Sequence, residues 1–305
     1  MDSNKTNIFS VTQELAGQRL DNFLIKKLKS LPKSLIYKLV RSGQVRVNKK
    51  RTKVSYRILD KDIVRIPPYL IKEETIARKL ITDANSYIHY ENENFIILDK
   101  PYGIAVHSGT NQNVDFLSSL RVSQDNNDLS LVHRLDKNTS GCLVISKNYK
   151  TASYLGKCLI QRDVHKKYYA LLSGTLENEI IEIESKIEKD ITQQKMVINE
   201  ETGREAYTKI TLKKQFQSYC FVEVEIETGR MHQIRIHAAS IGHPIAGDNK
   251  YGNKKSIDKD KLINLKRLFL HSHYISFYYK QNYEFILDLP EDLKEVLSYL
   301  EYTND

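Results

Sequence analysis

The chain has 305 residues, 40% of them hydrophobic, so it is long enough for one large domain or two domains with buried cores. Its net charge of +9 is uneven: residues 1–70 hold sixteen Lys and Arg against five Asp and Glu, whereas the remaining 235 residues hold 31 against 33. This asymmetry favours a polyanion-binding N-terminal module over a generally lysine-rich composition. No run of 18 apolar residues occurs, so we expect a cytoplasmic protein without a membrane anchor.

Cysteine and histidine spacing argues against a metal centre. Cys142, Cys158 and Cys220 are far apart and form no CxxC pair, which predicts buried thiols in a reducing compartment. His232 and His237 would lie about 140° apart on a helix and on opposite faces of a strand, so they do not point at one ion. The phosphate-loop, dinucleotide and GxSxG motifs are also absent.

The first predicted elements lie in residues 15–66. The stretch RLDNFLIKKLK at 19–29 has one apolar helical face, formed by Leu20, Phe23, Leu24 and Leu28. A second helix is predicted over LIYKLVRSG, with Ser34 as its N-cap and Gly43 at its end. The segment from Val45 to Ile66 then alternates apolar and polar residues on both sides of a basic NKKR turn, which predicts a small β-element.

Two basic helices followed by a small basic β-element resemble the S4 RNA-binding domain. The matching positions are Arg19-Leu20-Asp21, Ser34, Ile36, Gly43, the VRVN run at 45–48 and Asp62. We therefore expect an S4-like α+β domain over residues 1–68, a linker over 69–86 and a second domain over 87–305. The candidate RNA contacts of the first domain are Arg19, Lys38, Arg41, Arg46, Lys49 and Lys50. The alternative is a charged face that only contacts solvent.

The second domain is predicted to be a strand-rich α+β body. A hairpin is expected over 88–101 and a helix over YKTASYLGKCLIQ at 149–161, with Tyr154 and Leu155 on its apolar side. Strands are predicted over 164–174, 180–191, GREAYTKITL, SYCFVEVEIETG, RLFLHSHYISFYY and YEFILDLP. A helix is expected over MHQIRIHAASIG, HPIAGDNKYG is read as a loop, and Pro290 opens a last helix.

Three charged clusters within apolar surroundings are the candidates for chemistry. The first is LVHRLDKNTSGCLV at 131–144, where Asp136 precedes a turn-prone cluster at 138–141 and two apolar runs flank the loop. The others are Lys166-Lys167-Tyr168 and the segment from Arg230 to Arg235. Taken singly, a turn cap, a core tyrosine and a surface arginine are the more frequent explanations of these residues. A two-carboxylate glycosidase is not excluded by spacing either.

The stretch HRLDKNTSG resembles the HRLDxxTSG signature of the RluA family of ribosomal pseudouridine synthases. The resemblance continues through LDKPYGIAVHSG, the KxY at 166–168, GREAYT, ETGRMHQIRIH, GHPIAGDNKYG and KRLFLH, and the N-terminal motifs are most similar to the RluC branch. It implies a mixed, mostly antiparallel catalytic sheet preceded by the S4-like domain. It also implies an RNA partner, 23S ribosomal RNA or a large-subunit precursor, with no membrane and no obligate protein partner.

The resemblance assigns roles to individual residues. Asp136 matches the catalytic aspartate, Tyr168 the active-site tyrosine and Arg235 the arginine that pairs with that aspartate. Arg134 would help to displace the target base. The further residues expected to contact RNA near the site are His133, Leu135, Lys166, Arg230, His232 and Gln233.

The chemistry of uridine isomerisation suits this set. The C1′–N1 bond breaks, the uracil turns and reattaches through C5, and no redox step or phosphoryl transfer occurs, so we expect neither cofactor nor metal. Uracil leaves as a delocalised anion, so one carboxylate suffices, as nucleophile or as base. The competing classes are a non-catalytic RNA-binding factor and a nucleoside N-glycosylase, and release of the C5 proton without a change in mass would separate isomerisation from both.

Overall fold

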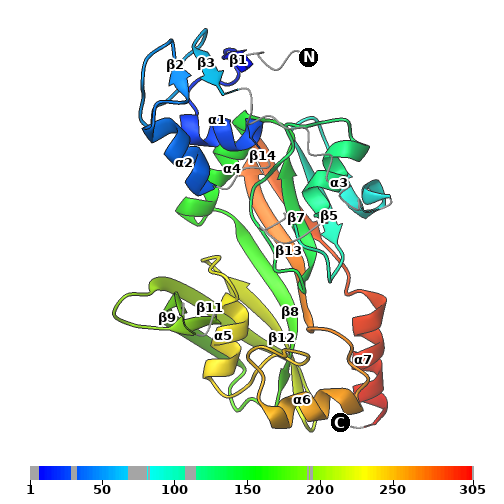
Figure 1. The fold of residues 1–305 in the computed structure, drawn as a ribbon. Coiled ribbons are helices and arrows are strands. Elements are labelled where there is room, and N and C mark those ends of the chain that lie inside the picture. Colours follow the sequence, from blue (N-terminus) through cyan, green and yellow to red (C-terminus); the bar gives the residue numbers. More distant parts are fainter. Residues whose placement is uncertain are drawn as a thin grey trace, which may run out of the picture. The chain divides into compact units, whose positions relative to one another are not determined.

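A computed structural model describes residues 7–28, 33–67, 81, 83–106, 115–190, 192 and 195–303. The chain divides into two compact units, residues 1–78 and 79–305 (Figure 1). Of the predicted linker at 69–86, residues 69–80 and 82 lie outside the described residues, as do residues 107–114 of the LDKPYGIAVHSG region. The predicted boundaries at 68 and 87 therefore stay predictions.

The first unit joins two helices to a small antiparallel sheet of strand order β1-β3-β2. Its elements are β1 (Asn7–Ser10), α1 (Leu20–Lys27), α2 (Lys33–Arg41), β2 (Arg46–Val47) and β3 (Ile63–Ile66). The four apolar residues predicted to form one face of the first helix are all buried in the core of this unit. Gly43 ends α2 with a φ of +74°, as expected of a helix stop. Ser34 is not the N-cap, because α2 already includes Lys33.

The second unit is built on one large mixed sheet. Its strand order is β10-β9-β11-β12-β8-β13-β7-β5-β4, with β14 paired to β13 and β6 paired to β7. Every pairing is antiparallel except that of β13 with β7. The strands are β4 (Ile88–Glu91), β5 (Phe95–Lys100), β6 (Ser130–Leu131), β7 (Ser140–Ser146), β8 (His165–Ser173), β9 (Ile180–Asp190), β10 (Lys195–Ile198), β11 (Arg204–Gln215), β12 (Tyr219–Ile226), β13 (Leu270–Tyr279) and β14 (Gln281–Ile286). The mixed, mostly antiparallel α+β fold expected from the sequence is confirmed.

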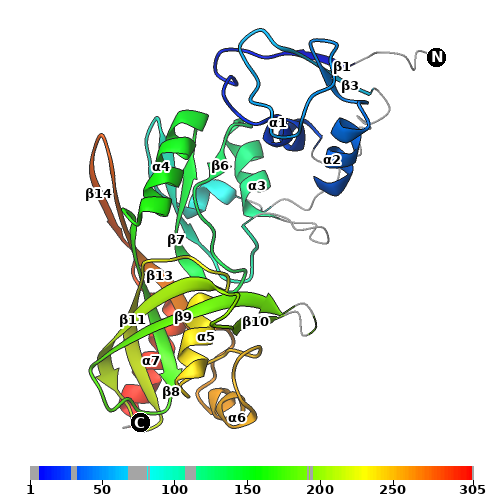
Figure 2. The same cartoon turned by 90° about the vertical axis from the view of Figure 1, so that its left-hand side faces the viewer.

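Helices cover both faces of this sheet (Figure 2). They are η2 (Ala84–Tyr87), α3 (Phe116–Ser123), α4 (Tyr149–Gln161), α5 (Gln233–Ser240), α6 (Lys254–Leu262) and α7 (Glu291–Tyr302). Because side chains alternate along a strand, the core clusters assign each helix to a face. Leu143 and Leu172 belong to the cluster that contains α3 and α5, whereas Val144 packs with α4 and Leu171 packs with α7.

Several details differ from the sequence predictions. Helices α3 and α6 and strand β10 were not predicted, whereas the bounds expected for α4 are those observed. Tyr154, expected on the apolar side of α4, is 39% exposed. The turn before β7 is shorter than expected, because Ser140 and Gly141 already belong to the strand.

Strands β7 and β13 approach each other unusually closely where β7 begins. Gly141 has a φ of +108°, and a Cβ atom on it would lie 2.1 Å from the backbone oxygen of Ser272 on β13. Only glycine therefore fits at this position. The close contact fixes the end of the loop that carries Asp136 against the centre of the sheet.

Candidate active site

The loop between β6 and β7 holds Asp136 in a tight turn. The Thr139 N–H donates to the Asp136 carbonyl oxygen at 3.1 Å, which closes the turn. A second turn, which follows β5, supports it: the Gly103 N–H and the Lys100 ammonium both donate to the carbonyl of Lys137, at 2.8 and 3.3 Å. The residue next to Asp136 is thus fixed by two independent hydrogen bonds.

Lys100 is a buried cation beneath this loop. Its side chain is 0% exposed, and its Nζ also donates to the carbonyls of Pro101 and Ile104, at 2.7 and 3.0 Å. Burial lowers the pKa of Lys100 to about 7, although the negative charge of Asp136 acts in the opposite direction. Lys100 therefore joins the two turns with three carbonyl contacts and carries a charge whose energy depends on Asp136.

The three charged clusters meet in one pocket of about 100 Å³. Its wall combines the loop before β7, Tyr168 on β8, and the start of α5, three segments that are far apart in sequence. Tyr168 is 6% exposed, and burial together with the nearby charge of Asp136 raises the pKa of its phenol, so the hydroxyl keeps its proton. The lining residues are Arg134, Leu135, Asp136, Thr139, Tyr168, Ile226, Gly229, Arg230, Met231, His232, Gln233, Ile234, Arg235 and Leu270.

Arg235 lies between two carboxylates. Its Nε and Nη2 each donate to Asp248, at 2.7 Å, in a bidentate pair, whereas its Nη1 lies 3.7 Å from Oδ2 of Asp136. Burial alone would lower the pKa of Arg235, but the hydrogen bond and charge of Asp248 outweigh it and raise the pKa. Burial would likewise raise the pKa of Asp248, but the Arg235 bonds hold it below its usual value. Arg235 is therefore a fixed positive charge beside Asp136.

Asp248 was missed in the sequence, where the GHPIAGDNKYG segment was predicted only as a loop. Its side chain is 0% exposed, and its Oδ1 also accepts the backbone N–H groups of Lys250 and Tyr251, at 2.9 and 3.1 Å. The available signal was an acid between two glycines in a motif of the resembled family. Nothing in the sequence linked that acid to Arg235.

His232 is a second polar group directed at the aspartate. Its Nε2 lies 3.7 Å from Oδ2 of Asp136, and its Nδ1 is 2.7 Å from the Tyr251 hydroxyl. That hydroxyl already accepts the Met196 N–H at 3.2 Å, which favours donation of its own proton to Nδ1. Burial lowers the pKa of His232, so we expect a neutral ring with its proton on Nε2, facing the carboxylate.

Comparison with known proteins identifies the family. The model of the RNA pseudouridylate synthase family matches residues 94–240, and that of the S4 domain matches residues 18–64. The Ribosomal large subunit pseudouridine synthase C of Haemophilus influenzae is 38% identical over 312 residues, covering 98% of this chain and 96% of that protein. The chain belongs to the RNA pseudouridylate synthase family. A protein of the same name from Buchnera aphidicola is 37% identical, with 90% of both chains covered.

Two solved structures share the pseudouridine synthase fold. Human RNA Pseudouridylate Synthase Domain Containing 4 gives a TM-score of 0.61 at 23% identity, covering 72% of this chain and 95% of that chain. Human RNA Pseudouridylate Synthase Domain Containing 1 gives 0.58 at 24% identity, covering 67% and 83%. The chain is thus an RNA pseudouridine synthase, which isomerises uridine to pseudouridine in RNA.

Not every residue predicted to contact RNA near the pocket of this pseudouridine synthase is free to do so. Gln233 is 3% exposed, and its amide bonds Thr228, Tyr207, Thr208 and the N–H of Arg230, so its part is to hold the turn before α5. His133 accepts the Val144 N–H at 3.1 Å, and burial lowers its pKa to about 3. These internal bonds argue against RNA contact by Gln233 and His133.

The other predicted contacts differ in exposure. Leu135 and Lys166 are each 5% exposed, and burial lowers the pKa of Lys166 to about 8. Arg134 is exposed at the pocket and Arg230 is half-buried there, with its Nε donating to the carbonyl of Glu205 at 3.0 Å. Arg134 is therefore the cation of this group that solvent reaches most readily.

In the S4 unit, four of the six predicted RNA contacts are exposed: Lys38, Arg41, Lys49 and Lys50. Lys49 has a positive φ in the turn that joins Val47 to Lys50, so this turn presents two adjacent ammonium groups. Arg46 is half-buried and donates to the Gly43 carbonyl.

Arg19 differs from those four, because its guanidinium bonds Asp21 at 3.1 and 2.8 Å at the start of α1. It therefore holds local structure instead of presenting a free cation.

Among the described residues, no group of three or more His, Cys, Asp or Glu side chains is arranged to hold a metal ion. The three cysteines are free and buried. No helix within the described part of the chain is long and apolar enough to cross a bilayer.

Proposed function

We propose that this pseudouridine synthase acts on large-subunit ribosomal RNA and that Asp136 is its catalytic carboxylate. The observation that carries the residue assignment is the convergence of Asp136, Tyr168 and Arg235 on one pocket. The relatives named Ribosomal large subunit pseudouridine synthase C support the choice of RNA, because they match over nearly the whole length of the chain. We further propose a cytoplasmic location, which the buried free thiols support.

The geometry gives Asp136 an oxygen that can react. Both cationic or polar neighbours, Arg235 Nη1 and His232 Nε2, lie 3.7 Å from Oδ2, beyond hydrogen-bonding distance. The guanidinium of Arg235 thus places a positive charge near this carboxylate without occupying its lone pairs. Asp136 can then act on the ribose of the target uridine as nucleophile or as base.

Tyr168 and Arg134 act on the nucleobase of the target uridine. To react, the uridine must leave its stack and enter the pocket, where the buried ring of Tyr168 offers an apolar face. The exposed guanidinium of Arg134 can take the place of the displaced base in the RNA. The uracil released by cleavage of the C1′–N1 bond can thus be held in place while it turns and forms the new bond through C5.

The test of this assignment is Asp136→Asn, with Asp128→Asn as a matched control at an exposed aspartate outside the pocket. D136N should bind RNA and unfold at the wild-type temperature but release no C5 proton from uridine, whereas D128N should keep wild-type turnover. Appreciable turnover by D136N would reject Asp136 as the catalytic group. Free uracil among the wild-type products would instead indicate an N-glycosylase.

The choice of RNA has its own test. Pseudouridines should be mapped across all stable RNAs of cells with and without this protein. We expect the sites that disappear to lie in the large-subunit ribosomal RNA. Loss confined to transfer RNA or small-subunit RNA would contradict the proposed substrate while leaving the activity intact.

A further inference from the structure

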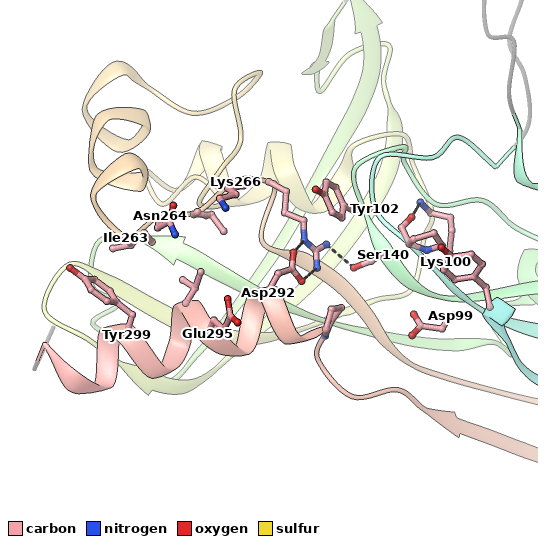
Figure 3. A pocket seen from close by; sticks show the side chains of 16 residues that line it. Asp99, Lys100, Tyr102, Ser140, Ile263, Asn264, Lys266, Asp292, Glu295 and Tyr299 are labelled. Carbon is pink, nitrogen blue, oxygen red and sulfur yellow. Dashed lines mark hydrogen bonds and ion pairs between the residues drawn. The ribbon is translucent and has the colours of Figure 1, made fainter. Parts of the chain in front are cut away.

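A second cavity, of about 580 Å³, lies close to the catalytic loop but is not part of the active-site pocket (Figure 3). It is walled by the end of β5, the segment before β13 and helix α7, and the two cavities share no lining residue. They meet at the end of the loop, however, because Thr139 lines the active-site pocket and Ser140 lines the second cavity. A group that holds Ser140 from this side can therefore influence the loop without touching the substrate.

Arg267 is that group. Its side chain is 3% exposed, and its Nη1 donates to the Ser140 hydroxyl at 2.9 Å. Its Nε and Nη2 form a bidentate pair with Asp292, in the first turn of α7, at 2.6 and 3.0 Å. Figure 3 labels the two partners of this guanidinium, Asp292 and Ser140, among the side chains that line the cavity.

The same guanidinium also supports the second turn beside the loop. Its central carbon lies 4.7 Å from the centre of the Tyr102 ring, within the range of a cation–π contact. Tyr102 precedes Gly103, whose N–H donates to the carbonyl of Lys137. Arg267 thus contacts both segments that flank Asp136: the turn that bonds Lys137, and the strand residue that ends the loop.

The hydrogen bond at Ser140 extends into the sheet. Because Arg267 donates to the Ser140 oxygen, the serine proton is available for Nδ1 of His271, 2.9 Å away on β13. Burial lowers the pKa of His271 to about 3, so the ring is neutral and can accept at Nδ1. Ser140 is therefore held from the α7 side and from β13 at once.

We propose that Arg267 is a positioning residue for pseudouridine formation, which anchors the catalytic loop to α7 and so sets the place of Asp136 opposite Arg235 and Tyr168. This inference rests on the proposed catalytic role of Asp136. A guanidinium is needed because one planar group must bond a carboxylate through two nitrogens, a serine through the third, and a tyrosine ring through its face. A lysine ammonium at this position reaches only some of these partners.

Because of the open cavity, Arg267 needs its ion pair with Asp292 on α7 to stay in place. A side chain enclosed on all sides would stay in place after losing one partner, but the open volume beside Arg267 gives it room to turn away from Ser140. Asp292 is therefore expected to act through Arg267. Asp292→Asn should reproduce part of the Arg267→Lys effect, although Asp292 does not line the active-site pocket.

The experiment measures single-turnover release of the C5 proton, RNA affinity and thermal unfolding for wild type, R267K, D292N and S140A. A displacement of catalytic groups by about 1 Å costs on the order of 100-fold in rate. We expect R267K to lower the single-turnover rate by about 10- to 100-fold, with RNA affinity within about twofold of wild type. Arg162→Lys, at an exposed arginine paired with Glu227, is the matched control and should keep the wild-type rate.

Two outcomes would overturn the proposal. One is a folded R267K enzyme with the wild-type single-turnover rate. The other is additive loss in the R267K/S140A double variant, because two residues that act through one hydrogen bond should lose little more together than the worse single variant. D136N is measured alongside: if it retains turnover, the assignment of Asp136 fails independently of what Arg267 does.

Discussion

Asp248→Asn tests how the active site is held together. The carboxylate of Asp248 accepts two bonds from Arg235 and two from backbone N–H groups, and its side chain is 0% exposed. Removing one partner of a buried ion pair costs about 3–5 kcal/mol, and Arg235 would then keep only Asp136, at 3.7 Å, as a nearby counter-charge. In a unit of this size, about 3 kcal/mol corresponds to a fall in Tm of about 6–12 °C.

The lowered pKa of Asp248 determines how the stability difference between wild type and D248N changes with pH. The folded-state pKa of Asp248 lies below its ordinary value of 3.8, so the ionised form is favoured by folding. This stabilisation is fully present above the unfolded pKa and is lost as the pH falls through the folded pKa. D248N should therefore lose stability relative to wild type near neutral pH, and the gap should narrow in acid below about pH 4.

The turnover of D248N should fall even under conditions in which the variant remains folded. Without Asp248, the guanidinium of Arg235 is free to form a close pair with Asp136, which would occupy an oxygen of the proposed catalytic carboxylate. We expect turnover to drop by about 100-fold at a temperature where the variant is folded. Thermal unfolding across pH and C5-proton release are the assays, with D128N as control. A Tm within about 2 °C of wild type together with unchanged turnover would refute this account of the Arg235–Asp248 pair.

Two further variants test the supports around the site and the S4 unit. The pKa of Lys100 is about 7 in the folded protein instead of 10.5, so between these pH values the unfolded chain holds one more proton than the folded chain. The free energy of unfolding contributed by Lys100 therefore rises with pH across that window. Lys100→Met should abolish this rise, which urea unfolding at several pH values measures, and Lys157→Met is the exposed control. Lys49→Ala combined with Lys50→Ala should make the slope of log affinity against log salt concentration shallower by about 1.4, or about 0.7 for each lost phosphate contact. Replacing Lys157 and Lys294, which lie on helices of the catalytic unit, should leave this slope unchanged. An unchanged slope for the S4 variant would argue against docking through this turn.

Local sequence patterns were sufficient to predict elements that bury a single face. The helix at 149–161 was predicted with its observed bounds from the spacing of its apolar residues. The structure adds an N-cap, because Asn148 accepts the Thr151 N–H. The loop that carries Asp136 was also predicted, because apolar runs flank a cluster of turn residues. In such segments, apolar periodicity and turn residues extend over only a few positions and can be recognised in the sequence.

Helix α6 shows where local patterns fail. Its sequence, KKSIDKDKL, has little apolar periodicity, and the helix depends on the Asn253 cap, which accepts the Ser256 N–H, and on Asp260, which bonds Tyr219 from β12. The Asn253 cap is local, but the partner of Asp260 comes from another part of the chain. Asp260 alone would read as one more surface acid. The same holds for Arg267, whose three partners lie on β7, on α7 and in the turn after β5.

The division of labour between two aspartates follows from how Arg235 is shared. Asp248 receives the bidentate fork at 2.7 Å, so its lone pairs are committed and its charge is neutralised, which makes it a structural group. Asp136 faces only the third nitrogen, at 3.7 Å, which is beyond hydrogen-bonding distance, so that nitrogen leaves its lone pairs free. A sequence motif can mark both residues as acids in loops, but only the folded geometry distinguishes the carboxylate that is bonded from the one left able to react.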